Sequence, residues 1–299
     1  MSAMNSTVLV VGDLMIDVVV DMPGELVRGS DMPSSISTTY GGTAANVAVW
    51  MAKANGRPRV FGAVGDDVWG QEIVQHLIQF SVDCLVKVTD DYQTGMVIAL
   101  CHPDGERSFF PDARANSALS SERVPWEDCD DVTHLYMSGY TLLNSATRAW
   151  AYELMQSARA RGITVVLDPA SSGPLSSVAA SELRRWLQAT DVLIPNQQEL
   201  TVLSALVPDI HSLVGSIAAK QGADGVTLYS SAHETHIPAV RATIIDTVGA
   251  GDAFAAGLLC GLASGQSFAD SAHFAVKVAA QAVSIRGAQP SASSTLAII

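Results

Sequence analysis

The sequence predicts an α/β fold with a mainly parallel, doubly wound central sheet, helices on both faces and a small additional β-sheet. From residue 132 onward, apolar runs of strand length alternate with helical stretches, which is the pattern of βαβ units. The strand signals near 15–40 and 85–110 do not fit this alternation, so we expect them to form a separate lid. No repeat or long linker divides the chain, which predicts a single domain over residues 1–299.

The first half of the chain mixes both kinds of element. The run VLVVGDLMIDVVV at 8–20 is apolar and β-branched, and Gly12-Asp13 divides it into two strands. Gly41 and Gly42 form a turn that leads into a helix over 41–54. The PDGER segment at 103–107 predicts a tight hairpin turn. Further strands are predicted at 34–40, 59–67, 85–89, 95–102 and 108–110, and a further helix at 68–80.

The second half alternates more regularly. Strands are predicted at 134–140, 163–170 and 191–196, followed by a strand pair at 225–231 and 234–239. Helices are predicted at 145–162, 181–189, 197–206, 211–222, 251–265 and 267–285. The last two helices are rich in alanine and other apolar residues, so we expect them to be well buried.

Composition excludes some classes of protein. Hydrophobic residues make up 48% of the chain and charged residues 16%, so a sizeable core is expected rather than disorder. The net charge of −13 argues against nucleic-acid binding, which requires a basic surface. No apolar run reaches the length of a membrane span, which predicts a soluble cytoplasmic protein. The four cysteines form no C-x-x-C pair, so we expect reduced thiols rather than a disulfide framework or a metal cluster.

The segment DTVGAGDAFAAGLL at 246–259 carries the strongest chemical signal. Gly249, Ala250 and Gly251 precede Asp252 and a helix-forming run, and glycine allows close backbone approach to a ligand. The N–H groups at such a helix N-terminus attract negative charge, which suits a phosphate or an oxyanion. A carboxylate beside them can accept the proton of an attacking hydroxyl. The spacing alone equally allows Asp252 to be only a helix cap and the glycines only a turn.

The 246–259 segment resembles the signature of the ribokinase family of carbohydrate and nucleoside kinases, also called the PfkB group. Five further segments resemble that family's motifs, and all six occur in the family's order along the chain. Six ordered motifs are far more specific than one glycine-rich turn. The resemblance therefore implies a ribokinase-like fold and an ATP-dependent kinase that acts on a hydroxyl of a sugar or sugar acid. The five segments are GGTAANVA (41–48), GAVGDDVWG (62–70), PNQQE (195–199), KQGADGV (220–226) and RGAQPS (286–291).

The resemblance also implies roles for the chemical step. Asp252 would be the general base that deprotonates the acceptor hydroxyl, and the 249–251 backbone would form the anion hole for the γ-phosphoryl group. Asn196 and Glu199 would help to hold Mg²⁺ through waters, because Mg²⁺ keeps several waters and relies on substrate phosphates. The same spacing also fits a helix-capping pair, and both interpretations can hold together.

Other matching positions concern the two substrates. Asp13 follows a buried strand, and α/β folds bind ligands at the carboxyl ends of their strands. Asp17 is a weaker candidate that fits a solvated strand residue equally well. The positions matching the family's sugar-binding residues are Asp13, Gly41, Gly42 and Asn46. The positions matching its nucleotide-binding residues are Asn196, Lys220, Gly222, Gly225 and Gly251.

The implied cofactors are ATP and Mg²⁺, with K⁺ as a further candidate. Asp246 and the backbone near Val248 resemble a monovalent-cation site found in part of the family. Thr43 stands where ribokinases usually carry lysine, which disfavours ribose as the acceptor. The segment HPDGERSFF at 102–110 resembles the lid hairpin of sugar-acid and ketohexose kinases. Arg107 in that hairpin is a candidate contact for an acceptor carboxylate or hydroxyl, unless it is only a surface charge.

Alternative functions stay open at this point. A nucleoside kinase would share the fold, and Phe109, Phe110 and Tyr140 would supply stacking partners for a base. A non-catalytic sugar- or nucleotide-binding regulator would share it too, although the intact motif around Asp252 argues against this. A Rossmann oxidoreductase and a P-loop kinase are disfavoured because neither glycine-rich motif occurs. Exposed edges of the lid strands favour a homodimer through the lid.

Overall fold

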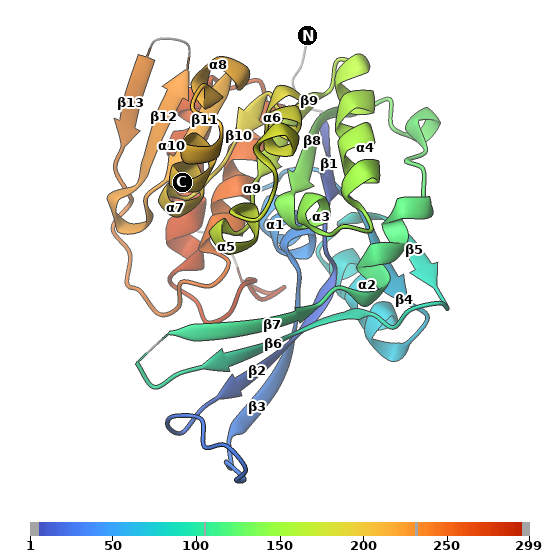
Figure 1. The fold of residues 1–299 in the computed structure, drawn as a ribbon, viewed down its shortest axis with the longest axis vertical. Helices are drawn as coiled ribbons and strands as arrows, with labels where there is room; N and C mark the ends of the chain where they lie inside the picture. The colour runs from blue at the N-terminus through green and yellow to red at the C-terminus, as the bar shows by residue number, and fades with distance from the viewer. Residues whose placement is uncertain (1–5, 105, 231–232, 295–299) are drawn as a thin grey trace.

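The computed structural model describes residues 6–104, 106–230 and 233–294. Its main feature is a nine-stranded sheet in the order β13-β12-β11-β10-β9-β8-β1-β4-β5 (Figure 1). All neighbouring strands from β11 to β5 run parallel, whereas β12 runs antiparallel to both of its neighbours, β11 and β13. The strands are β1 (Thr7–Val11), β4 (Pro58–Gly65), β5 (Asp83–Thr89), β8 (Val132–Ser138), β9 (Thr164–Asp168), β10 (Val192–Leu193), β11 (Ser216–Lys220), β12 (Val226–Ser230) and β13 (His233–Ile237). The predicted doubly wound sheet is therefore confirmed.

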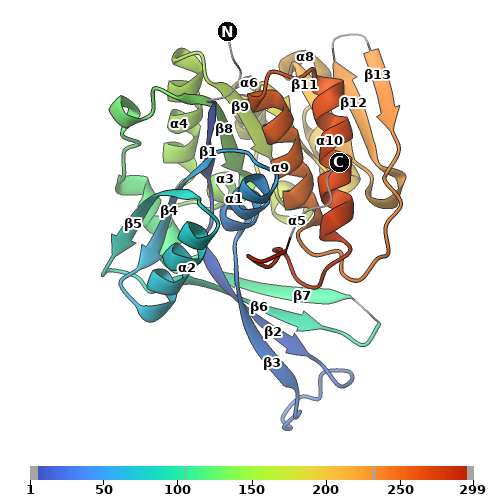
Figure 2. The same ribbon diagram turned by 180° about the vertical axis from the view of Figure 1, so that it is seen from behind.

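Helices cover both faces of this sheet, as Figures 1 and 2 show from opposite sides. Val8 and Val10 of β1 belong to one hydrophobic core, and Leu9 and Val11 to the other. This explains why central strands read as continuous apolar runs rather than as alternating ones. The first core is covered by α1 (Thr43–Lys53), α2 (Val68–Gln79), α9 (Ala250–Ala263) and α10 (Phe268–Ala282). The second is covered by α3 (Gly139–Leu143), α4 (Arg148–Ala160), α5 (Ser172–Leu175), α6 (Ala180–Gln188), α7 (Gln197–Leu206) and α8 (Ile210–Leu213).

Helix α9, which follows the strongest sequence motif, lies against both α1 and α10. Every residue from Ala253 to Gly261 is buried, so this helix has no solvated face over that stretch. Small residues allow the close packing: a Cβ on Gly257 would overlap Ala275 of α10, and one on Gly261 would overlap Ser271. Rigid packing of the helix fixes the position of its N-terminal turn, which carries Asp252.

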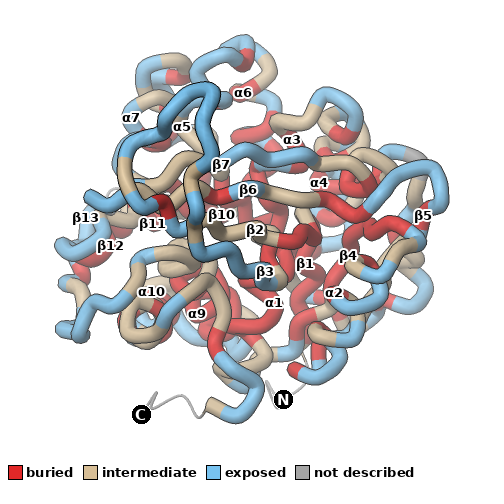
Figure 3. The backbone as a smooth tube through the Cα atoms, turned by 90° about the horizontal axis from the view of Figure 1, so that it is seen from below, coloured by how far each residue is buried: buried red, intermediate tan, exposed pale blue. Residues whose placement is uncertain are grey.

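The lid is a four-stranded sheet in the order β3-β2-β6-β7, formed by β2 (Met15–Asp21), β3 (Ser35–Gly41), β6 (Gly95–Cys101) and β7 (Arg107–Asp112). It crosses the end of the molecule at which the parallel strands terminate (Figure 3). The predicted lid range of 85–110 was wrong at its start, because 85–89 belongs to β5, which pairs with β4 in the main sheet. Helix α2 connects β4 to β5 as a βαβ crossover, and such a crossover requires a parallel neighbour in the same sheet. The tip of the predicted 103–107 turn, Gly105, lies outside the described residues.

One predicted helix is a strand. The range 211–222 contains only the end of the short α8, and β11 follows over Ser216–Lys220. The alanines of this segment suggested a helix, but Ile217, Ala218 and Ala219 are buried on both sides of the sheet. Tertiary burial outweighs the intrinsic preference of alanine for helix. Because this segment is a strand and not a helix, Lys220 lies at the carboxyl end of a parallel strand.

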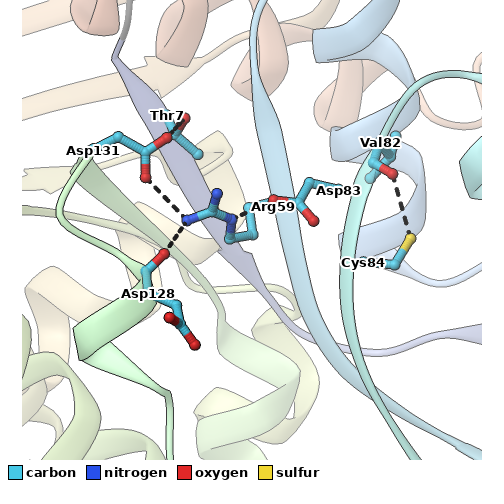
Figure 4. A network of polar contacts seen from close by, with 7 residues as sticks. All are labelled: Thr7, Arg59, Val82, Asp83, Cys84, Asp128 and Asp131. Carbon is cyan, nitrogen blue, oxygen red and sulfur yellow. Dashed lines mark hydrogen bonds and ion pairs between the residues drawn. The ribbon is translucent and has the colours of Figure 1, made fainter.

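Polar contacts around Arg59, at the start of β4, hold together the amino ends of neighbouring strands in the main sheet (Figure 4). Its guanidinium pairs with Asp83 of β5 and with Asp131, and it also donates to the carbonyl of Asp128. Thr7 of β1 donates to Asp131 at 2.6 Å. These contacts connect the amino ends of β1, β4, β5 and β8. Among the described residues, no helix is long and apolar enough to cross a bilayer.

Candidate active site

The polar residues of the site come from the carboxyl ends of neighbouring strands. The chain runs from β1 outward to β4 and β5 on one side, and later from β8 to β11 on the other, so the strand order reverses between β1 and β8. Doubly wound sheets bind ligands at such a switch point. The side chains that gather there are Asp13 after β1, Tyr140 after β8, Asp168 at the end of β9, Asn196 after β10 and Lys220 at the end of β11.

These side chains line a cavity of about 510 Å³, which we call the acceptor cavity. The lid contributes one wall through Met15, Asp17, Val97, Phe109 and Pro111. The N-termini of two helices contribute another, with Gly42, Thr43 and Asn46 from the start of α1 and Gly249, Gly251 and Asp252 from the start of α9. The cavity therefore brings together segments that lie more than two hundred residues apart in the chain, such as Asn46 and Asp252.

Asp252 lies in the first turn of α9. The turn begins at Gly249, whose φ of 75° is left-handed and where a Cβ would overlap the backbone of Ala288. Glycine is thus required both by conformation and by space. Burial raises the pKa of Asp252 to about 7, opposed by a hydrogen bond from Asn46 and reinforced by the charge of Asp168. A carboxylate with this pKa is suited to accept a proton near neutral pH.

The Asn46 amide is oriented by a chain of hydrogen bonds. Its Nδ2 donates to Asp252 Oδ2 at 2.7 Å, and its Oδ1 accepts from Gln289 Nε2 at 2.9 Å. Gln289 Oε1 in turn lies 2.7 Å from His76 Nε2. Burial lowers the pKa of His76, which favours the neutral ring. Because Gln289 occupies the oxygen of the Asn46 amide, the nitrogen of that amide is left to face Asp252.

Asp13 and Asp17 both reach the acceptor cavity, and burial raises the pKa of each to about 6. A Cβ on Gly41 would collide with the Asp17 carboxylate, and one on Gly42, where φ is 89°, with the backbone of Asp13. The two glycines thus allow both carboxylates to approach the start of α1. From the sequence, Asp17 was only a weaker candidate for the site. The strand alternation was the signal that could have found it, because Asp17 follows the cavity-lining Met15 at i+2 on β2.

Asn196 and Glu199 form a capping box at the start of α7. Asn196 Oδ1 accepts from the Glu199 N–H at 2.8 Å, while the Glu199 carboxylate accepts from the Asn196 backbone N–H at 2.8 Å and from Asn196 Nδ2 at 2.6 Å. Both residues also line the acceptor cavity. Burial raises the pKa of Glu199, and the charge of Asp168 adds to this. Within the described residues no group of three or more His, Cys, Asp or Glu side chains could hold a metal ion.

Lys220 and Asp168 form a buried ion pair across the ends of β11 and β9. Lys220 Nζ lies 2.7 Å from Asp168 Oδ2, with the two side chains 16% and 9% exposed. Burial favours the neutral amine, but the charges of Asp168 and Glu199 outweigh it and raise the pKa of Lys220. The ammonium group is therefore charged throughout the physiological range. Asp168 was not anticipated from the sequence, where the only signal was its position at the end of a predicted strand.

A second cavity, also of about 510 Å³, adjoins the first, and we call it the nucleotide cavity. Gly222, Gly225, Ala250 and Gly251 line it together with Arg241. Its remaining wall is largely apolar and includes Ile244, Phe254, Val276, Ala279 and Val283. The residues shared by the two cavities are Lys220, Gly222 and Gly251. An apolar compartment beside backbone N–H groups suits a nucleotide base and its phosphates.

Two predicted site residues, Arg107 and Asp246, are not among the residues that line the acceptor cavity. Arg107 of the lid does not line the acceptor cavity; its Nη2 lies 2.9 Å from Asp246 Oδ1. Asp246 also accepts hydrogen bonds from the backbone N–H groups of Val248 and Gly287, both at 3.0 Å. Burial raises the pKa of Asp246, but these hydrogen bonds and the Arg107 charge outweigh it and lower that pKa. The ion pair connects the lid to the loop before α9.

The chain is similar over nearly its whole length to known kinases. The model of the family described as "pfkB family carbohydrate kinase" matches residues 5–295. A fructokinase from Escherichia coli is 29% identical over 273 residues, which are 87% of this chain and 86% of that protein. An ATP-dependent ribose-1-phosphate kinase from Halopiger xanaduensis is 30% identical over 226 residues, covering 73% of this chain and 72% of the relative.

Solved structures agree on the fold. A ribokinase from Cryptococcus neoformans in complex with ADP superposes with a TM-score of 0.82 at 26% identity, and covers 98% of both chains. A nucleoside kinase from Methanocaldococcus jannaschii, described as an archaeal member of the ribokinase family, gives a TM-score of 0.84 at 19% identity over 95% of this chain and 93% of that one. The ribokinase-like fold predicted from the six motifs is therefore confirmed.

Proposed function

Because the chain belongs to the pfkB family of carbohydrate kinases and is therefore a phosphotransferase, we propose that it transfers the γ-phosphoryl group of ATP to a hydroxyl group of a sugar-like acceptor. The observation that carries this proposal is the position of Asp252. Its carboxylate faces the acceptor cavity, while Gly251 beside it lines both that cavity and the nucleotide cavity. The base thus adjoins the boundary that a transferring group must cross.

In the proposed step, the acceptor hydroxyl gives its proton to Asp252 and its oxygen forms a bond to the γ-phosphorus. The bond between that phosphorus and the oxygen of ADP breaks, and ADP leaves. The N–H groups of residues 249–251 stabilise negative charge on the phosphoryl oxygens, aided by the dipole of α9. Asn46 orients Asp252 by its hydrogen bond at 2.7 Å. Lid closure over the cavity would exclude water, which competes as an acceptor.

ATP fits the nucleotide cavity by its chemistry. Phe254, Val276 and Val283 offer apolar surface for the base, and the glycines at 222, 225 and 251 leave room for the phosphates. The ADP complex of the similar Cryptococcus neoformans ribokinase supports this assignment. Among the predicted nucleotide-binding residues, Asn196 lines only the acceptor cavity, so its contribution would be to the phosphate end.

Mg²⁺ fits the site only through waters. The carboxylate oxygens of Glu199 already accept two hydrogen bonds from Asn196, so this pair would bind water molecules of the ion rather than the ion itself. Such an arrangement agrees with the coordination chemistry of Mg²⁺, which usually keeps several water ligands and binds phosphate oxygens. When bound, the ion would neutralise charge on the β- and γ-phosphates.

The monovalent-cation site proposed from the resemblance has a competitor in this chain. The Asp246 carboxylate pairs with Arg107, whose guanidinium supplies a fixed positive charge. Any K⁺ at Asp246 would have to displace that group or share the carboxylate with it. We therefore expect the activity to depend little on K⁺ while Arg107 is present.

The charges of the acceptor cavity favour an uncharged polyol. Asp13, Asp17 and Asp252 line it, and Lys220, whose charge is balanced by Asp168, is the one basic side chain among its described lining residues. An acceptor with its own carboxylate or phosphate would meet these acidic groups and would compete with the nucleotide phosphates for this one ammonium group. The fructokinase similarity supports a sugar. Sugar acids, the other predicted acceptors, are disfavoured by like-charge repulsion.

A nucleoside is the second candidate acceptor. Phe109 and Tyr140 line the acceptor cavity but remain 56% and 39% exposed, from the lid and from α3 respectively. Large aromatic side chains left exposed at a cavity are suited to stack on a flat base. The structural likeness to nucleoside kinases concerns the fold alone, so these two aromatic residues carry this candidate.

We also propose a homodimer through the outer face of the lid. Val18, Ile98 and Phe110 are direct cross-strand partners, and Ile36 pairs with Val20 on the same face. Ile36, Ile98 and Phe110 are 64%, 41% and 58% exposed. This face is opposite the one that lines the acceptor cavity, and an exposed apolar face of this kind is typical of an interaction surface.

The experiment that tests the proposed function is ADP release from Mg-ATP with a panel of pentoses, hexoses, sugar acids, sugar phosphates and nucleosides. Asp252→Asn is the matched control. A single acceptor class that raises ADP release, and loses this effect in the variant, would support the kinase and identify its substrate. ATP binding without turnover of any acceptor would favour a non-catalytic nucleotide-binding protein instead.

A further inference from the structure

The boundary between the two cavities contains one charged side chain. Of the three residues that line both cavities, Gly222 and Gly251 have no side-chain functional group, and Lys220 carries an ammonium group. A Cβ on Gly251 would lie 3.6 Å from Lys220 Nζ, so this ammonium group adjoins the proposed anion hole directly. Any group that passes from the nucleotide to the acceptor must pass beside it.

The surroundings of Lys220 are strongly acidic. Asp168 lies at 2.7 Å, and Glu199 and Asp252 are close enough to raise the pKa of the amine further. An ammonium group has three N–H donors, and within the described part of the chain Lys220 uses one of them, toward Asp168. Two donors therefore remain for a ligand. A triphosphate that enters among these three carboxylates meets like charges, and the free N–H donors of Lys220 would offset part of that repulsion.

We propose that Lys220 is a catalytic residue that binds the γ-phosphoryl group during transfer, and that Asp168 is the positioning residue that holds its ammonium group at the boundary. This inference rests on the proposed kinase function. Lys220 keeps its proton throughout: the hydroxyl proton goes to Asp252, the new O–P bond forms and the bond to ADP breaks. The ammonium group stabilises the phosphoryl oxygens together with the adjoining 249–251 backbone.

The assignment is narrower than a general role in nucleotide binding. A lysine that contacts the α- or β-phosphate would contribute equally to the binding of ATP and ADP. A lysine that contacts the γ-phosphoryl group contributes to ATP and to the transition state, and hardly to ADP. The ratio of the two affinities therefore separates the roles without any measurement of turnover.

The test compares Lys220→Gln with the wild-type protein by calorimetric titration with Mg-ATP and with Mg-ADP. Loss of a charge-assisted hydrogen bond should weaken ATP binding about tenfold or more. We expect ADP affinity to stay near its wild-type value. With the acceptor found in the panel, kcat should fall by about 10²–10³-fold, the usual effect of losing one oxyanion donor. Equal weakening of ATP and ADP, or unchanged binding of both, would overturn the proposal.

Removing one member of a buried ion pair can unfold a protein, because the other charge is left uncompensated. The double variant Lys220→Gln, Asp168→Asn keeps a neutral hydrogen-bonding pair and should show the same selective loss of ATP affinity. In Lys220→Ala, added ethylamine should restore part of the turnover, which a purely structural lysine would not allow. Lys277→Gln, on the exposed side of α10, is the matched control and should change neither affinity.

Failure of this inference differs from failure of the proposed function. If the wild-type protein binds ATP more tightly than ADP and Lys220→Gln removes this preference, the role at the γ-phosphoryl group stands even when no acceptor is turned over. If an acceptor is phosphorylated but the variant retains both turnover and the ATP preference, the kinase stands and the assignment of Lys220 falls.

Discussion

Asn46 Nδ2 donates a hydrogen bond of 2.7 Å to Asp252 Oδ2, which joins the N-terminal turns of α1 and α9. The two residues are 206 positions apart in the chain, and each belongs to a separate sequence motif. The contact opposes the effect of burial on the pKa of Asp252, which nevertheless lies at about 7. The ionisation of the proposed base is thus set by two helix ends at once.

The first prediction concerns the pH dependence of turnover. A general base acts only when it is deprotonated, so kcat/KM for the acceptor should fall below about pH 7, in line with the pKa of Asp252. Asp252→Asn should lower kcat by about 10²–10⁴-fold or more and abolish this acid limb. Initial rates of ADP release between pH 5 and 9 measure both. Near-normal turnover in the variant would remove Asp252 from the chemical step.

The second prediction concerns stability. Burial raises the folded-state pKa of Asp252 from 3.8 to about 7, so ionisation of this group favours the unfolded chain. Its contribution to stability is fully present below the unfolded pKa and is lost as the pH rises through the folded pKa. Asp252→Asn should therefore raise the melting temperature at pH 8, and raise it less at pH 5. Thermal unfolding at both pH values checks this, and a lower melting temperature of the variant at pH 8 would contradict it.

The third prediction concerns Gln289, which orients the Asn46 amide. In Gln289→Leu the amide is free to turn, and Asp252 loses part of the hydrogen bond that lowers its pKa. The acid limb of kcat/KM should move to higher pH, while ATP affinity should stay unchanged. Gln266→Leu, in the exposed turn after α9, is the control. An unchanged pH profile with reduced melting temperature would leave Gln289 a purely structural role.

The fourth prediction concerns Asp17 as an acceptor ligand. Its carboxylate lines the acceptor cavity from the lid, so Asp17→Asn should raise KM for the acceptor with little effect on ATP binding. Loss of one charge-assisted hydrogen bond predicts about a tenfold change or more. Asp21→Asn, on the same face of β2 but away from the cavity, is the matched control. Equal effects of the two substitutions would exclude a specific contact by Asp17.

The fifth prediction concerns the oligomeric state. A glutamate introduced at Ile98 in the outer face of the lid should convert a dimer into monomers, because a buried unpaired charge is costly. Light scattering coupled to size-exclusion chromatography measures the mass directly. Ser35→Glu, on the opposite face of the same sheet, should leave the dimer intact. If the wild-type protein has the mass of a monomer even at high concentration, the proposed lid interface does not form.

The sequence by itself determined the class of fold and the core of the site. Continuous apolar strands alternating with helices require a parallel sheet covered on both faces, and the 246–259 motif predicts a helix N-terminus with Asp252 in its first turn. Strands, helices and the turn before Asp252 can be predicted because each depends on the residues of one continuous segment. The structure confirms the order of the elements and puts Asp13, Asn46, Asn196, Lys220 and Asp252 around one cavity.

Only the tertiary structure decided which of these groups meet and which do not. The partnership of Lys220 with Asp168, that of Arg107 with Asp246 and the hydrogen bond from Asn46 to Asp252 all join segments far apart in the chain. Strand 216–220 was mistaken for a helix because alanine intrinsically prefers helix, whereas pairing and burial between neighbouring strands determined its conformation. Side-chain partners depend on the order of strands in the sheet and on the packing of helices, and neither can be predicted from the residues of a single segment.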